Sequence, residues 1–249
     1  MISEKEYDHH RRAAYHFFQR LEDYLNRQFL TPAELRRRVE KVVAHAEVST
    51  DKCDKGKRSP EAAFVKSYVL PAVHDFLANW PSMNAEKARN AVRVEGYKYC
   101  LNLACGSPGR FVPHPFGKVL GKTASDIMSD WRQHGRKSFP AGSFPDMALG
   151  APFKTVIECK YFRDGGTGRA ESVLVEGLYE ACFYLGLSRF PSGRRGVAWD
   201  YEFGCFLAGD VSEEGGLYKA WQSLSRSVRS GIWDGANTYA MVLRGQQPG

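Results

Sequence analysis

Two strand-forming stretches joined by a turn constrain the fold of this chain more than any other feature. Residues 155–162, Thr-Val-Ile-Glu-Cys-Lys-Tyr-Phe, are rich in β-branched and aromatic side chains, which is typical of a strand. Residues 143–149 form a shorter candidate strand. The residues between them, 150–154, contain both Gly and Pro, the strongest local turn signals. The sequence therefore predicts a β-hairpin.

The centre of the turn decides which residues of this hairpin face each other. With the turn centred on Pro152, Asp146 and Glu158 are each six residues away from it. They would then lie opposite each other, about 5 Å apart at the backbone. A slip of one residue would change this pairing. Glu158 and Lys160 are two residues apart and therefore share one face of the strand, with Ile157, Cys159 and Tyr161 on the other.

Two carboxylates and one ammonium in a hairpin with apolar flanks suggest metal-dependent chemistry. Charges inside a covered strand are costly unless they are paired or bound to a metal. Mg²⁺ prefers carboxylate and water oxygens, and it can polarise a phosphoryl oxygen. Lys160 would orient the attacking water or stabilise charge on the phosphate, and the backbone carbonyl of Cys159 would supply a further ligand. The same Glu-x-Lys spacing is also common on exposed strands, where it is only a solvated edge.

Pro145-Asp146 followed by Glu158-Cys159-Lys160 resembles the signature of the PD-(D/E)XK nuclease superfamily, which includes many restriction endonucleases. The resemblance implies a restriction-endonuclease-like α/β fold, with a mixed β-sheet flanked by helices, and Mg²⁺-dependent cleavage of DNA. It also implies that Asp146 and Glu158 bind the metal and that Lys160 is catalytic. The order of the surrounding elements extends the resemblance to about residues 59–244.

Length and charge fit this interpretation. A chain of 249 residues suits one large domain, or one domain with a helical appendage. Its net charge of +7 favours a polyanionic partner, although a merely basic soluble protein has the same balance. No run is long enough to span a membrane, and the N-terminus lacks an apolar signal core. We therefore expect a cytoplasmic protein with no membrane partner.

The N-terminal region predicts helices. Residues 3–29 have apolar positions at three- and four-residue steps, and residues 31–34, Thr-Pro-Ala-Glu, give a capping signal for a second helix that ends near Ala46. Together they predict an antiparallel helical hairpin in residues 1–50, followed by a nuclease core in residues 51–249. Three roles are open for this hairpin: packing on the core, dimerisation, or contact with DNA through its basic residues. A third helix should begin at residues 59–61 and end near Leu77. Its Glu61 is a candidate accessory metal ligand, or simply an acid favoured by the helix dipole.

The remaining elements complete a mixed α/β layer. We expect helices at residues 85–93, 171–187 and 215–230, and strands at residues 94–103, 201–207 and 238–243. In the helix at 171–187, the resemblance points to Glu176 as the polar residue presented to the active site, whereas Glu180 reads as solvated. The basic residues expected to contact DNA phosphates are Lys118, Lys122, Arg132, Arg136, Lys137, Arg163 and Arg169.

The leading hypothesis is a Mg²⁺-dependent endodeoxyribonuclease acting on double-stranded DNA, as a type II-like restriction enzyme or a related defence nuclease. Because cutting both strands calls for two sites, we expect a homodimer. One alternative is a non-catalytic DNA-binding module with a nuclease-like fold. Another is a structural or protein-binding α/β domain whose charged hairpin is an ordinary salt-bridged strand pair.

Overall fold

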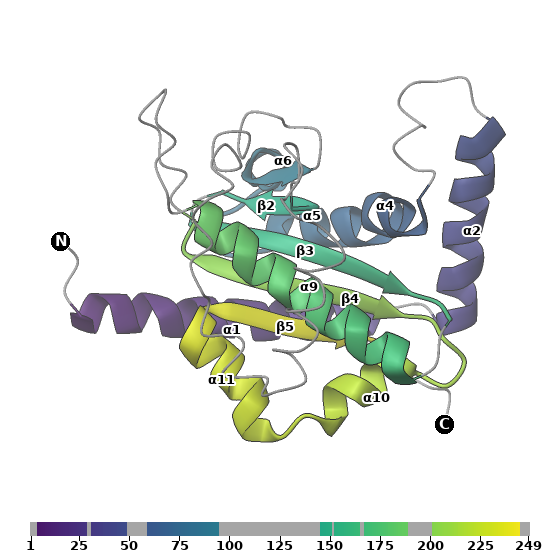
Figure 1. Cartoon of the computed structure of the whole chain (residues 1–249). Helices are drawn as coiled ribbons and strands as arrows, with labels where there is room; N and C mark the ends of the chain where they lie inside the picture. The colour runs from purple at the N-terminus through teal and green to yellow at the C-terminus, as the bar shows by residue number, and fades with distance from the viewer. Residues whose placement is uncertain are drawn as a thin grey trace.

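The computed structural model describes residues 4–28, 31–48, 59–94, 145–150, 152–164, 167–188 and 201–244. These residues form a mixed α/β fold around a five-stranded sheet in which the strands follow one another in sequence order (Figure 1). The first three strands are antiparallel, and the last three run parallel to one another. The strands are β1 (Val92–Val94), β2 (Met147–Leu149), β3 (Thr155–Phe162), β4 (Phe203–Asp210) and β5 (Thr238–Leu243).

Helices cover both faces of the sheet. Figure 1 shows α9 in front of the strands, with α1 and α5 behind them. The helices are α1 (Glu4–Gln28), α2 (Pro32–Val48), α4 (Pro60–Phe64), α5 (Leu70–Ala78), α6 (Ala85–Ala91), α9 (Thr167–Ser188), α10 (Gly216–Ser223) and α11 (Arg226–Ala236). A π-helical turn, η1 (Val65–Val69), joins α4 to α5. None of the helices in the described ranges is long and apolar enough to cross a membrane.

The predicted hairpin has the predicted register. Met147 pairs with Ile157 and Leu149 pairs with Thr155, so continuing the pairing by one residue places Asp146 opposite Glu158. The turn is closed by hydrogen bonds from the backbone N–H groups of residues 153 and 154 to the carbonyl of Gly150. The centre of the turn inferred from Gly and Pro was therefore correct, and β2 begins directly after Asp146.

The central strands are buried on both sides. Ile157 and Cys159 of β3 belong to the apolar cluster beneath α1 and α4, whereas Phe206 and Ala208 of β4 pack under α9 and α10. All eight residues of β4 are buried, as expected for a parallel strand covered on both faces. The two charged side chains Glu158 and Lys160 therefore lie on a face that is largely shielded from water.

The two N-terminal helices pack on the core, but they do not lie antiparallel to each other as expected. In Figure 1, α1 runs along the sheet while α2 stands beside α4, in a clearly different direction. Phe18 of α1 and Leu35 of α2 are fully buried in the same cluster as Ile157. Arg36 of α2 donates to the backbone carbonyls of Arg163 and Val211. Each helix buries its apolar stripe against the rest of the fold.

Most of the other predicted helices and strands differ from the observed ones only at their ends. The strand expected at residues 94–103 begins at Val92, and residues 95–103 lie outside the described ranges. The helix expected at 171–187 begins earlier, at Thr167, and the strand expected at 201–207 continues to Asp210. The helix expected at 215–230 is two helices, because Ser225 caps a new one by accepting a hydrogen bond from the N–H of Val228.

The third helix runs from Pro60 to Ala78, as expected, but contains the π turn. Pro71 follows this turn. Proline has no N–H to donate within a helix, and its ring clashes with the carbonyl four residues earlier. The N–H of Leu70 instead reaches back to the carbonyl of Val65, a spacing of five residues. The wider turn thus accommodates Pro71 without ending the helix.

Candidate metal centre at the edge of the central strand

The candidate site lies where β2 leaves β3. Strand pairing between them ends at Met147 and Ile157, and in the described part of the chain no strand pairs with the following residues of β3 on that side. The side chain of Asp146 replaces a neighbouring strand as the partner of Cys159, since its Oδ2 accepts a hydrogen bond of 2.7 Å from the N–H of Cys159. The N–H and carbonyl of one strand residue face the same side. The carbonyl of Cys159 is therefore directed towards this edge.

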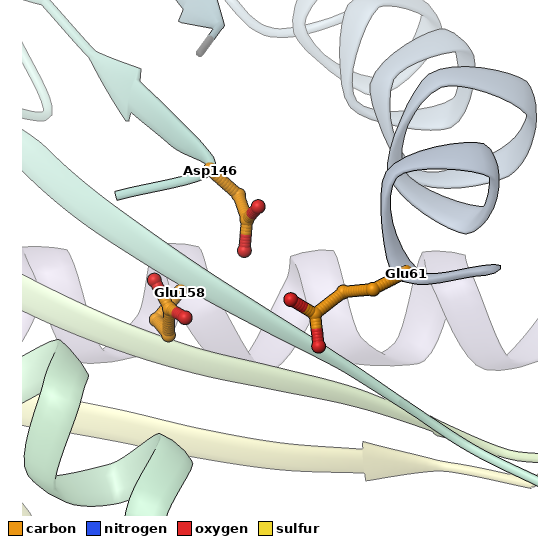
Figure 2. A group of neighbouring side chains, drawn as sticks. All are labelled: Glu61, Asp146 and Glu158. Carbon is orange, nitrogen blue, oxygen red and sulfur yellow. The ribbon is translucent and has the colours of Figure 1, made fainter. Parts of the chain in front are cut away.

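Three carboxylates converge at this edge. Glu61, Asp146 and Glu158 each offer an oxygen, and these oxygens lie within 4.8 Å of one another. Figure 2 shows the three side chains pointing into one common space from α4, from the residue before β2 and from β3. Ser59 fixes the start of α4 by capping the N–H of Ala62. The local capping signal thus aims Glu61 at the two acids of the hairpin.

Glu158 is the buried member of this group. It is only 5% exposed, and among the described residues its Oε2 has no hydrogen-bond partner. Burial raises the pKa of Glu158 well above its usual value, and the nearby charge of Asp146 raises it further, although Lys160 partly offsets both. A buried carboxylate oxygen without a partner is costly. A cation held by the three carboxylates would remove both the repulsion and the missing interaction, so these residues fit a hard divalent metal.

Lys160 is held among carboxylates. Its Nζ lies 2.9 Å from Glu158 Oε1, 2.7 Å from Glu180 Oε2 and 3.8 Å from Glu61 Oε2. Burial alone would lower the pKa of Lys160, but the charges of Glu158, Glu61 and Glu180 outweigh it and raise the pKa above its usual value. Lys160 therefore remains an ammonium and acts as a fixed positive charge.

The carboxylate that α9 supplies is Glu180, and the expectation that Glu180 is solvated was wrong. Glu180 is 4% exposed, whereas the half-buried Glu176 is not among the described ion-pair partners of Lys160. The sequence did contain a signal that Glu180 faces the sheet. Glu180 follows Gly177 by three residues and precedes Tyr184 by four, which places the three residues on one helix face.

Gly177 allows α9 to approach β3 and β4 closely. A Cβ at this position would lie 2.2 Å from the ring of Phe206 and 2.9 Å from Cγ of Lys160. No larger residue fits there without moving its neighbours. The absence of a side chain at Gly177 thus brings Glu180 within reach of the ammonium of Lys160.

Four carboxylates, those of Glu61, Asp146, Glu158 and Glu180, belong to one group with the ammonium of Lys160. An ordinary salt-bridged strand pair joins one acid to one base. A group that gathers this many carboxylates fits the ligand set of a cation.

Two of the basic residues expected at a DNA surface are described. Arg163 is exposed at the end of β3, where it pairs with Asp164 at 2.7 Å and with Glu40 at 3.5 Å. Arg169 is exposed in the first turns of α9. The other five, Lys118, Lys122, Arg132, Arg136 and Lys137, lie outside the described residues.

Comparison of this chain with protein-family models, with curated proteins and with solved structures finds no match. Fold and site alone therefore define its class. It is a mixed α/β protein with a carboxylate-lined candidate metal centre beside a partly buried lysine.

Proposed function

We propose that this protein is a Mg²⁺-dependent endodeoxyribonuclease with a restriction-endonuclease-like fold. The observation that carries the proposal is the convergence of Glu61, Asp146 and Glu158 on one space beside the ammonium of Lys160. The PD-(D/E)XK resemblance implies this combination of acids and lysine on a mixed sheet flanked by helices. The sheet order and the register of β2 with β3 support it.

Each residue has a separate role in this proposal. Glu61, Asp146, Glu158 and the backbone carbonyl of Cys159 supply oxygen ligands of the kind that Mg²⁺ prefers. Mg²⁺ bound there would polarise a phosphoryl oxygen and lower the pKa of a bound water. Lys160, which stays protonated, orients the attacking water and stabilises negative charge on the phosphate, but does not accept a proton.

Glu180 acts through Lys160. Its carboxylate, 2.7 Å from Nζ, holds the ammonium on the α9 side while Glu158 turns its second oxygen to the common space. Without Glu180, the flexible side chain of Lys160 would have more freedom to move away from the phosphate. Glu180 is thus a positioning residue.

The proposed substrate and biological role rest on the net charge of the chain and on the PD-(D/E)XK resemblance. The net charge of +7 supports a polyanionic substrate. Arg169 is exposed, and Arg163, also exposed, would exchange its ion pairs with Asp164 and Glu40 for DNA phosphates. We propose double-stranded DNA as the substrate, a homodimer as the form that cuts both strands, the cytoplasm as the location, and restriction or related defence as the role.

A cleavage assay tests the proposal. Purified protein is incubated with supercoiled plasmid DNA in Mg²⁺ and, separately, in EDTA. We expect cleavage only with Mg²⁺, and a loss of about 10²–10³ in rate for Lys160→Ala, the scale of losing one charge-stabilising group. Glu171→Gln, which removes an exposed carboxylate of α9, is the control and should cleave at the wild-type rate. DNA binding without Mg²⁺-dependent cleavage by the wild type would instead support the non-catalytic module.

A further inference from the structure

A second candidate site lies at the opposite side of the sheet. A cleft of about 780 Å³ opens beside β5, between α1, α10 and the turn that follows β4. The candidate metal centre, by contrast, is on the β2 side of β3. Small-molecule sites have volumes of about 300–1,000 Å³, and in open α/β sheets they lie at the carboxyl ends of parallel strands. Size and place both fit a binding site.

The cleft is negatively charged in a chain that is positive overall. The charged side chains that line it are Glu22, Glu213, Glu214, Lys219 and Arg244. Arg244 is 3.7 Å from the fully buried Asp210, which neutralises its charge. Three carboxylates then face the single ammonium of Lys219, whereas the whole chain carries +7. The cleft therefore favours a cationic ligand.

The walls of the cleft are held in place. The hydroxyl of Tyr239 donates to Glu22 Oε2 at 2.5 Å. Arg244 donates to the carbonyls of Ser212 and Glu213 at 3.5 Å and 3.0 Å, which fixes the turn that carries the other two acids. Gly215, with φ of +64°, leaves the space that the guanidinium of Arg244 occupies. A site whose walls are already ordered loses less entropy when it binds.

One wall of the cleft is aromatic. Tyr218, which is 36% exposed, and Trp221 both line it. The guanidinium of Arg229 already lies 5.9 Å from the centroid of the Trp221 ring, so this part of the structure does place a cation over an aromatic face. Aromatic faces attract ammonium groups and cover methylene groups. Carboxylates combined with aromatic rings suit an organic cation better than a bare metal ion.

We propose that this cleft binds a linear polyamine, a flexible chain with several separated ammonium groups. The spacing of the acids supports this class of ligand. Glu22 lies in α1, whereas Glu213 and Glu214 lie in the turn that follows β4. The acids therefore line the cleft from two elements and offer anchors on two of its walls to an extended cation. This site does not depend on the proposed nuclease activity.

Isothermal titration calorimetry with spermidine tests the proposal on the full chain, in EDTA so that no divalent metal competes. We expect saturable binding at one site, weakened about tenfold in the Glu213→Gln/Glu214→Gln variant, since two exposed ion pairs are lost. The matched control, Glu86→Gln/Glu171→Gln, removes the same charge from exposed positions away from the cleft and should bind like the wild type.

Asp146→Asn separates this cleft from the metal centre. It should retain wild-type spermidine affinity, because Asp146 does not line the cleft. Three results would overturn the proposal: no saturable heat with the wild type, equal weakening in the control pair, or loss of binding in Asp146→Asn while the Glu213→Gln/Glu214→Gln variant still binds.

Discussion

Asp146→Asn should make the metal-free protein slightly more stable and at the same time inactive. The amide is nearly isosteric with the carboxylate, and its oxygen can still accept the hydrogen bond from the N–H of Cys159. What the substitution removes is a negative charge from a group of three carboxylates. A residue that serves a metal site is strained without its metal, so its removal relieves that strain.

The magnitude follows from the geometry. Two unit charges 4.8 Å apart repel by about 3.5 kcal/mol at an effective dielectric constant of about 20. Asp146 is half-buried and Glu61 is also partly exposed, so solvent screening reduces each repulsion, with Glu61 and with Glu158, to about 1 kcal/mol. A neutral hydrogen bond to Cys159 is weaker than a charged one by about 1 kcal/mol. The net gain is about 1 kcal/mol, or a rise of about 2–4 °C in Tm for a chain of this size.

Thermal unfolding in EDTA and in Mg²⁺ measures both effects. Mg²⁺ should raise the Tm of the wild type, because at a hundred times its Kd the ion adds about 2.7 kcal/mol to the free energy of unfolding. Asp146→Asn should gain far less. Asp8→Asn, at an exposed position in the first turns of α1, is the control and should behave as the wild type in both conditions. A Tm of Asp146→Asn several degrees below wild type in EDTA, with no Mg²⁺ effect on either protein, would refute the reasoning. That result would mean that the carboxylate belongs to a stabilising ion-pair network.

Three further predictions follow from individual side chains. Glu180→Gln should lower kcat by at least tenfold in the plasmid assay with little change in KM, whereas Glu176→Gln should cleave normally; equal effects would contradict the positioning role. Gly177→Ala should destabilise the fold by about 2 kcal/mol through overpacking, while Gly168→Ala, where a Cβ meets nothing within 4 Å, should be neutral or slightly stabilising in denaturant unfolding. The pKa of Glu22 is raised by burial, so the folded chain binds this proton more tightly and loses stability as pH rises above about 4.5. Glu22→Gln should flatten that slope in unfolding measured across pH, and an unchanged slope would contradict the assignment.

Local signals in the sequence were enough for the hairpin and for its acids. Gly150 and Pro152 fixed the turn, the turn fixed the register, and the register placed Asp146 opposite Glu158. The alternation of side chains then put Glu158 and Lys160 on one face of β3. Each of these steps depends on residues only a few positions apart, which is why they could be read without the fold.

The role of α9 could not be assigned in this way. Glu176 and Glu180 are one helical turn apart, and both are acids beside an apolar stripe. Which of them meets Lys160 depends on where α9 lies along the sheet and how closely it approaches. Gly177 sets that approach where it faces Phe206 of β4 and Lys160 of β3, which are distant from it in the sequence. The periodicity of a helix specifies which face is buried, but not how closely the helix approaches the sheet or where along the sheet it lies.

The N-terminal helices show the same division between local and tertiary information. Their existence and their ends follow from apolar periodicity and from the capping residues 31–34, because both are local. Their arrangement does not, since an apolar stripe can be buried equally well against a second helix or against a sheet. The chain by itself determined which segments form most of the strands, turns and helices, and which acids share a hairpin. Only the tertiary packing decided that α1 and α2 join the core and that Glu61 and Glu180 complete the charged group, because such contacts depend on surfaces that are far apart in the sequence.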